Sequence, residues 1–283
     1  MKHLNTYITE YIIKKKLDKP IDSEDHYEYY PETKQELIDN IKELFDKEET
    51  DLNCIDTSKI TDMSRLFESY KNINFDISKW NVSNVTNMDS MFNKCIRFDC
   101  DLSNWDVSNV EDMGDMFYNC YSFNCDLSNW NVSKVKNMSY MFSNCKKFNC
   151  NIGNWNIKNV KNMNALFFGC YNFKGNGLEN WDVSKVENMK GIFSWCLKFN
   201  CDLSKWDVSN VNNMDFMFEN CKKFDCDLSN WDVSNVISMK YMFQNCENFK
   251  AKDLDKWDVS NVKDMDLMFA NCIKLKKIPS WYK

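Results

Sequence analysis

The chain has 283 residues, of which 43% are hydrophobic and 15% aromatic, with only six glycines and three prolines. This composition supports a continuous buried core and excludes a largely disordered or collagen-like chain. The formal net charge of −6 provides no basic surface for nucleic acid or acidic membranes.

Residues 1–50 differ from the rest of the chain and predict a helical N-terminal cap. A first short helix is indicated by four spaced apolar residues: Leu4, Ile8, Tyr11 and Ile12. A second helix, over residues 31–47, starts near Pro31 and has one apolar face: Leu37, Ile38, Ile41, Leu44 and Phe45. An open stack of repeats needs its first coil covered, so we interpret this segment as a cap. A separate interaction domain is the alternative.

Residues 51–283 repeat a unit of about 25 residues and form the second predicted domain. The tryptophans mark the period: Trp80, Trp105, Trp130, Trp155, Trp181, Trp206, Trp231 and Trp257. A degenerate unit precedes them and a truncated unit follows, which gives about nine coils.

Two periodicities alternate within each unit. One set of residues has the i, i+3, i+4, i+7 spacing of a two-turn helix: Met88, Met91, Phe92 and Cys95. Asn87, just before this set, is suited to cap the helix. A second set has the i, i+2, i+4 alternation of a strand with one buried face: Phe98, Cys100 and Leu102. Stacked units of this kind predict an α/β repeat solenoid with one short strand and one two-turn helix per coil. Two units, at 173–181 and 249–257, contain an extra residue that predicts a bulge at the strand start.

The fourteen cysteines recur in two columns at the repeat period. Because they lie at an apolar phase, we interpret them as buried, reduced thiols rather than as disulfides or metal ligands. Zinc is disfavoured since there is no CxxC pair and the two histidines are His3 and His26.

The repeated motif MFxNCxxFxCDLSNWDVSNVxNM resembles the unit of the BspA-like leucine-rich-repeat family over about residues 52–275. The resemblance implies a right-handed, leucine-rich-repeat-like solenoid with a protein-binding or adhesive role. Members of that family are often exported surface proteins. In this chain, by contrast, the N-terminus has no signal-peptide core and no segment has the roughly 20 apolar residues of a membrane span, so we expect a cytoplasmic location.

Motifs of enzyme active sites are not found in the sequence. GxGxxG, GxxxxGK[ST] and GxSxG are all missing, and neither histidine lies in the repeats to serve as a base. We therefore expect a non-enzymatic protein with no catalytic residues, no cofactor and no metal.

Positions that break the pattern of their column are candidates for partner binding. One set of apolar outliers surrounds the first-column cysteines: Phe168, Tyr171, Trp195 and Leu197. A second set leans outward on the predicted helical side: Tyr140, Phe216, Tyr241 and Leu267. Exposed aromatic patches often mark protein interfaces. The alternative is that these residues cover a neighbouring coil or the cap.

Carboxylates recur at the outward phase of the predicted strands: Asp99, Asp101, Asp126, Asp202, Asp225 and Asp227. We interpret them as a solvated acidic face, with a surface for a basic partner or calcium as the alternative.

Together these features predict a non-enzymatic protein–protein interaction solenoid that presents a rigid curved surface to an unidentified protein partner. Neither nucleic acid nor a membrane is expected as a partner. Two rival hypotheses are an adhesin-like surface protein and a virus- or phage-encoded binder that inhibits a host protein.

Overall fold

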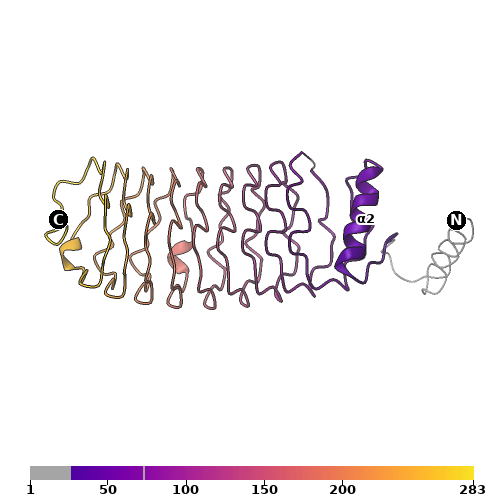
Figure 1. Cartoon of the computed structure of the whole chain (residues 1–283), viewed down its shortest axis with the longest axis horizontal. Coiled ribbons are helices and arrows are strands. Elements are labelled where there is room, and N and C mark those ends of the chain that lie inside the picture. The colour runs from indigo at the N-terminus through magenta and orange to yellow at the C-terminus, as the bar shows by residue number, and fades with distance from the viewer. Residues whose placement is uncertain (1–26, 73) are drawn as a thin grey trace, which may run out of the picture.

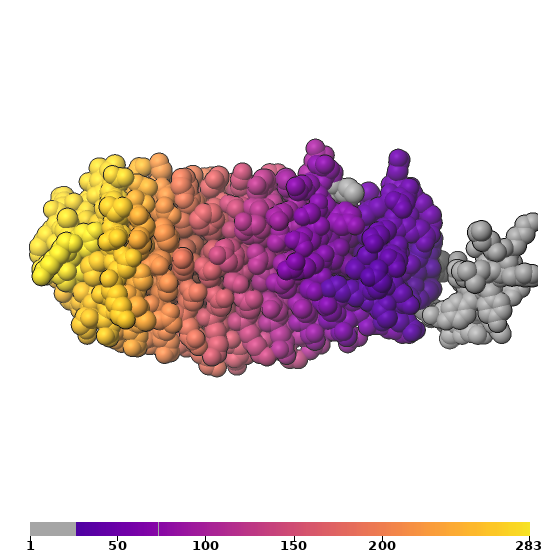
Figure 2. Space-filling model, viewed as in Figure 1, coloured from indigo at the N-terminus to yellow at the C-terminus, as the bar shows by residue number. Residues whose placement is uncertain are grey.

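The structure, a computed structural model, describes residues 27–72 and 74–283. These residues form an elongated column of stacked coils with the N-terminal and C-terminal coils at opposite ends (Figure 1). The space-filling view in Figure 2 shows that side chains close the column into one continuous body. The first predicted helix, with Leu4, Ile8, Tyr11 and Ile12, lies outside the described residues.

The predicted α/β solenoid, with a strand and a two-turn helix in each coil, is wrong. In the described part of the chain, α2 (Lys34–Asp46) is the single α-helix, and it is joined by two 3-10 turns, η1 (Leu178–Asn180) and η2 (Leu254–Lys256). The same residues contain no strand longer than an isolated parallel bridge. One ladder of such bridges takes one residue from each coil: Asp62, Asn87, Asp112, Asn137, Asn162, Asn188, Asn213, Ser238 and Asp264.

Tight turns replace the helix that the sequence predicts in each coil. Alternate N–H groups bond to the next coil, as Asp115 N–H does to the Ser139 carbonyl at 2.8 Å and Phe117 N–H to the Met141 carbonyl at 2.9 Å. The N–H groups that alternate with these close local turns, since Met116 N–H donates to the Met113 carbonyl at 3.3 Å and Tyr118 N–H to the Asp115 carbonyl at 3.0 Å. The turns point side chains inward at a spacing of three to four residues, which imitates the period of a helix.

Asn87 as a helix cap and residues 98–102 as a strand are also wrong predictions, because turns and irregular backbone replace the helix and the strand in each coil. Asn87 does not cap a helix; it is a bridge residue whose Oδ1 accepts the N–H of Asp89 at 2.9 Å. Phe98, Cys100 and Leu102 are buried as expected, but they lie in irregular backbone with no ladder. Burial follows the apolar pattern even where the secondary structure does not.

The core is a stack of rings and sulfurs that runs along the column. Phe142 stacks on its neighbour Phe117 at 5.6 Å between ring centroids, and the Trp130 indole N–H donates to the Leu102 carbonyl at 3.0 Å. All fourteen cysteines lie in the described residues, and all are free. Burial raises the pKa of the Cys95 thiol to about 12, so this side chain packs as an uncharged group.

The two 26-residue units accommodate their extra residue in the 3-10 turns η1 and η2, not in the predicted bulge. Each turn follows a residue in the left-handed region: Gly177, with φ of 91°, precedes η1 and Asp253, with φ of 54°, precedes η2. The 3-10 turn shortens the path of the longer segment and keeps Leu178 and Leu254 buried.

The helix predicted over residues 31–47 is present as α2, which lies across the first coil (Figure 1). Thr33 is its N-cap and forms a capping box with Glu36, so Pro31 precedes the helix instead of lying in its first turn. Its inner face is buried: Leu37, Ile41 and Leu44. Ile38 and Phe45 are partly buried against the same core. The division into domains at residue 50 stays a prediction.

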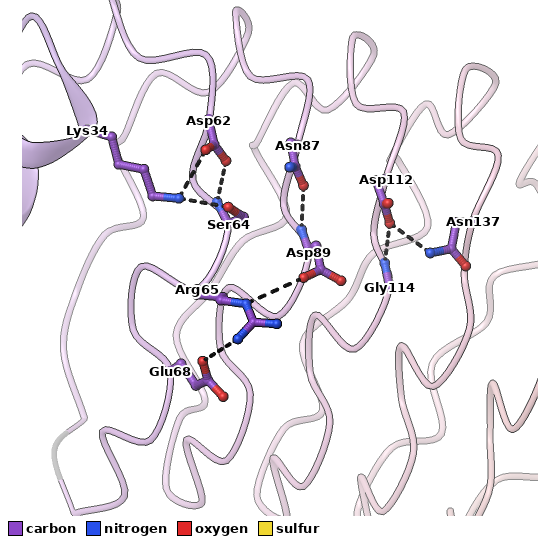
Figure 3. A network of polar contacts seen from close by, with 10 residues as sticks. All are labelled: Lys34, Asp62, Ser64, Arg65, Glu68, Asn87, Asp89, Asp112, Gly114 and Asn137. Carbon is purple, nitrogen blue, oxygen red and sulfur yellow. Dashed lines mark hydrogen bonds and ion pairs between the residues drawn. The ribbon is translucent and has the colours of Figure 1, made fainter.

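A polar network attaches α2 to the first coil (Figure 3). The Lys34 ammonium donates to Asp62 Oδ2 at 3.0 Å and to Ser64 Oγ at 2.7 Å. Farther along the column, Arg65 lies 4.0 Å from the Asp89 carboxylate of the next coil. In the described residues, no helix combines the length and the apolar character needed to cross a membrane.

Candidate functional site

Two positions in every coil hold a residue in the left-handed region, with φ between 52° and 70°. We call the first set the outer column: Arg65, Ser90, Asp115, Tyr140, Ala165, Gly191, Phe216, Tyr241 and Leu267. We call the second set the asparagine column: Ser69, Lys94, Asn119, Asn144, Gly169, Trp195, Asn220, Asn245 and Asn271. Glycine and asparagine adopt this conformation most readily, and bulky residues do so at a cost in free energy.

Trp195 is the one aromatic residue in the asparagine column. Where successive coils carry asparagine, the side-chain amides form a ladder, as Asn144 Nδ2 donates to Asn119 Oδ1 at 2.8 Å and the pattern resumes from Asn220 onward. Gly169 and Trp195 interrupt it. Trp195 is 41% exposed, and its bulky side chain does not suit the left-handed region. It also cannot continue the amide ladder. No role in the fold therefore explains a tryptophan at this position.

The outer column changes size at the same two coils. It reads Tyr140, Ala165, Gly191 and Phe216 along four successive coils, which places two small residues between two aromatic ones. A Cβ added at Gly191 would meet no atom closer than Ser194 Cβ at 4.0 Å, so the space above it is open. The column therefore creates a depression two coils wide.

This depression is a hollow of about 330 Å³, which we call the aromatic hollow. Its lining includes five aromatic side chains: Tyr118, Tyr140, Phe168, Trp195 and Phe216. Tyr118 and Tyr140 contact each other edge to face, with ring centroids 6.2 Å apart. Rings held by neighbouring coils give the hollow rigid apolar walls of the kind that protein interfaces use for anchor residues.

Two charged side chains also line the aromatic hollow. The Glu219 carboxylate accepts a hydrogen bond from the buried Ser194 hydroxyl at 2.8 Å. The Lys190 ammonium lies 5.8 Å from the centre of the Phe216 ring. The hollow thus combines apolar walls with one fixed acceptor and one cation. In the part of the chain that the structure describes, no group of three His, Cys, Asp or Glu side chains is placed to hold a metal ion.

The structure brings together members of both predicted aromatic sets. Phe168 and Trp195 share the hollow with Tyr140 and Phe216, and Tyr241 adjoins it by stacking on Phe216 with centroids 5.0 Å apart. These members of the two predicted sets therefore belong to one surface. Their role in binding a partner stays a prediction.

Three other predicted residues lie away from the lining of the aromatic hollow. Tyr171 is exposed, and its ring centre is 5.9 Å from the Lys146 ammonium. Leu197 is half-buried, and Leu267 is exposed on the last coil. Spacing along the sequence grouped Tyr171 and Leu197 with Trp195, but neither side chain lines the aromatic hollow.

Several residues of the hollow were not predicted from the sequence: Tyr118, Ala165, Lys190, Gly191 and Glu219. The available signal was the pair of small residues in the outer column, where the flanking coils carry large ones. Unusually large side chains do not reveal this site, because the hollow depends on two unusually small residues in the outer column.

The predicted acidic residues serve the local backbone. Ser103 N–H donates to Asp101 Oδ1 at 2.9 Å, and Ser204 N–H donates to Asp202 Oδ1 at 3.0 Å. The same bond recurs at two further members: Asp126 and Asp227. These Asx turns explain why Asp-x-Ser repeats in the sequence. The two-residue spacing from aspartate to serine was the signal that could have predicted this structural role.

The other two members of the acidic set join neighbouring coils. Asp99 Oδ1 accepts the Asn124 N–H at 3.1 Å, and Asp225 accepts the Lys250 N–H at 3.2 Å. Hydrogen bonds from Lys252 and Ser229 lower the pKa of Asp227 to about 2. A structural role thus accounts for the recurrence of these carboxylates, and their contact with a basic partner stays a prediction.

Comparison with known protein families gives one match. The family described as "Mycoplasma protein of unknown function, DUF285" matches residues 39–154 and 142–253, which together span well over half of the 283 residues. No curated protein sequence matches the chain.

Proposed function

The chain belongs to the DUF285 family, and from the surface described above we propose that it is a non-enzymatic module that binds another protein at the aromatic hollow. The observation that carries this proposal is Trp195. A partly exposed indole occupies a left-handed position where the other coils mostly place asparagine. Residues kept against the local preference of the fold are typical of functional sites.

The mechanism we propose is the rigid display of a preformed site. The walls of the hollow come from adjacent coils that are joined by backbone bonds, as Trp195 N–H donates to the Glu219 carbonyl at 2.7 Å. Binding to such a site orders few side chains, which reduces the entropic cost of association. Aromatic side chains with one carboxylate suit a partner that inserts an apolar or cationic side chain.

Two finer assignments belong to this proposal. We place the function in the cytoplasm, because fourteen free cysteines suit a reducing compartment. We also retain kinship with BspA-like leucine-rich-repeat proteins, which is supported by the repeated motif. It is independent of the predicted helix and strand, which the structure contradicts.

Replacing Trp195 with asparagine tests the proposal without damaging the fold. Asparagine suits the φ of 63° and allows Asn220 to extend the amide ladder, so Trp195→Asn should preserve or raise the melting temperature. Gly191→Tyr fills the hollow with a residue that the outer column carries at Tyr140 and Tyr241. Leu267→Asn is the matched control, since it changes an exposed outer-column residue that is not part of the lining of the hollow.

The measurement is affinity capture followed by mass spectrometry with wild type and the three variants. We expect a protein that wild type and Leu267→Asn retain and that both Trp195→Asn and Gly191→Tyr lose. Equal capture by all four proteins, or capture of nothing by folded wild type, would contradict the proposed site.

A further inference from the structure

Lysines gather on one side of the aromatic hollow, although the formal net charge of −6 predicts no basic surface. In four successive coils the four residues after the first-column cysteine include a single carboxylate, Asp225. The same stretches include six lysines, which we call the lysine strip: Lys146, Lys147, Lys174, Lys198, Lys222 and Lys223. All of these except the half-buried Lys146 are exposed.

Most charges of the lysine strip are not neutralised by the protein. Lys222 forms an ion pair with Glu247 at 3.0 Å, but the other five lysines form none with residues 27–72 and 74–283. Their contacts are with uncharged groups. The Lys146 ammonium lies 4.1 Å from the centre of the Tyr121 ring, and the Lys198 ammonium donates to Asn172 Oδ1 at 2.6 Å. The strip therefore offers positive charge to an external anion.

The opposite rim of the aromatic hollow differs, because its charges are paired within the protein. Lys161 lies three residues before Asn164 of the lining, and Glu187 lies three residues before Lys190. Lys161 and Glu187 form an ion pair at 3.0 Å. The hollow thus has one rim with paired charges and one positive rim, so a charged partner would bind in a preferred orientation.

The lysine strip lies close to the lining of the hollow. Trp195 and Glu219 line the hollow, and Lys198 and Lys222 each follow one of them by three residues. Three residues span at most about 10 Å. The chain also turns tightly here, since Lys222 N–H donates to the Asn220 carbonyl at 3.0 Å. One short segment of a partner can therefore fill the hollow and contact the strip.

The chemistry of the hollow selects an aromatic anchor that carries a hydrogen-bond donor. Phe168, Trp195 and Phe216 provide apolar ring surfaces. The Glu219 carboxylate is held by the buried Ser194 hydroxyl at 2.8 Å, and a carboxylate can accept more than one hydrogen bond. Tryptophan and tyrosine suit this combination, because the ring packs on the walls and the N–H or O–H can donate to Glu219.

We propose that the aromatic hollow and the lysine strip together bind an acidic segment of another protein. One tryptophan or tyrosine of the segment enters the hollow, and aspartate or glutamate residues on one side of it contact the strip. This inference rests on the proposed function and adds the chemistry and the orientation of the partner. A nucleic acid fits less well, because the net charge of −6 opposes a long polyanion and Glu219 repels phosphate.

The test begins with a selection from a display library of random short peptides on immobilised wild type. We expect the enriched peptides to share one tryptophan or tyrosine with several aspartate or glutamate residues on one side of it. Fluorescence anisotropy then measures the affinity of a synthetic enriched peptide. Its binding should weaken as salt is added, and should weaken when phenylalanine replaces the anchor, which removes the donor.

Two double variants with the same change of charge locate the acidic side of the peptide. Lys198→Gln/Lys223→Gln removes two exposed charges of the lysine strip and should weaken binding about fivefold, with a smaller dependence on salt. Lys158→Gln/Lys185→Gln removes two exposed lysines outside both the strip and the lining of the hollow, and should leave binding unchanged. Circular dichroism checks that each variant is folded.

The outcomes separate this inference from the proposed function. Suppose that the enriched peptides carry an aromatic residue without acidic neighbours, lose Trp195→Asn and bind Lys198→Gln/Lys223→Gln normally. The acidic partner is then wrong, and the hollow remains the binding site. Peptides that bind Trp195→Asn as tightly as wild type would contradict both proposals.

Two further results would overturn the acidic partner. The first is a selection that enriches no peptide on folded wild type. The second is that single-stranded oligothymidine or phosphatidylserine vesicles bind more tightly than the peptide and lose affinity in Lys198→Gln/Lys223→Gln, because the lysine strip would then serve a nucleic acid or a membrane.

Discussion

The two ends of the column differ although they are built from the same columns of residues. At the first coil Thr57, Ile60 and Met63 are at most 2% exposed, because α2 covers them. At the last coil the corresponding residues are partly exposed: Val259, Val262 and Met265. One end is closed by α2, whereas at the other end four N–H groups have no acceptor among residues 27–72 and 74–283.

The difference shows that stacking has a direction in this molecule. N–H groups at the four alternate positions always donate toward the C-terminal coil, so one end presents carbonyls and the other presents N–H groups. Two such ends are complementary, and an uncovered molecule would add to itself without limit. Helix α2 lies across the end that presents carbonyls, so we expect it to block such growth.

The largest expected effect comes from removing the cover. Ile41, which is 1% exposed on α2, changed to aspartate should destabilise the fold by about 3 kcal/mol or more, since a carboxylate would be buried in the core. It should also produce head-to-tail association through the carbonyls of the first coil. Thermal denaturation and light scattering at several concentrations measure both effects. Lys42→Ala, on the exposed face of α2, is the control, and an Ile41→Asp protein that stays monomeric would contradict the blocking role of the helix.

A matched pair of methionines compares the ends directly. Met63→Ala creates a cavity at the covered end and should cost about 3 kcal/mol, whereas Met265→Ala at the open end should cost about 1 kcal/mol. Met63 is fully buried and Met265 is not, which is the physical reason for the difference. Urea unfolding of the two variants provides the comparison. Equal losses would mean that the last coil is covered in solution.

The smallest effect concerns the segment that follows the last coil. Asp255 Oδ1 accepts the Ser280 N–H at 2.6 Å, and this bond, with help from Lys277, lowers the pKa of Asp255 to about 2. A carboxylate with a lowered pKa stabilises its contacts above the ordinary value near 4, and this stabilisation is lost as the pH falls from about 4 towards 2. The Ser280 amide signal should therefore shift over that range. Asp255→Asn should remove the shift, and a pH-independent signal in wild type would contradict the assignment.

The repeat itself determined which residues are buried. Columns such as that of Trp130 and Phe142 could be assigned from their period, because a side chain that recurs once per coil must meet its copies in a stack. Helix α2 could also be predicted, because its turns are stabilised by bonds within a short segment of sequence. In both cases the necessary information is local or strictly periodic.

The tertiary structure alone decided the backbone of each coil and the shape of its surface. Met88, Met91 and Phe92 have helical spacing, yet their N–H groups alternate between local turns and acceptors about 25 residues away. Period alone does not distinguish these two arrangements. The aromatic hollow depends on Ala165 and Gly191 lying between the larger side chains of the flanking coils, and the asparagine ladder depends on hydrogen bonds between successive coils. Both are relations between coils, so they arise only when the coils are stacked.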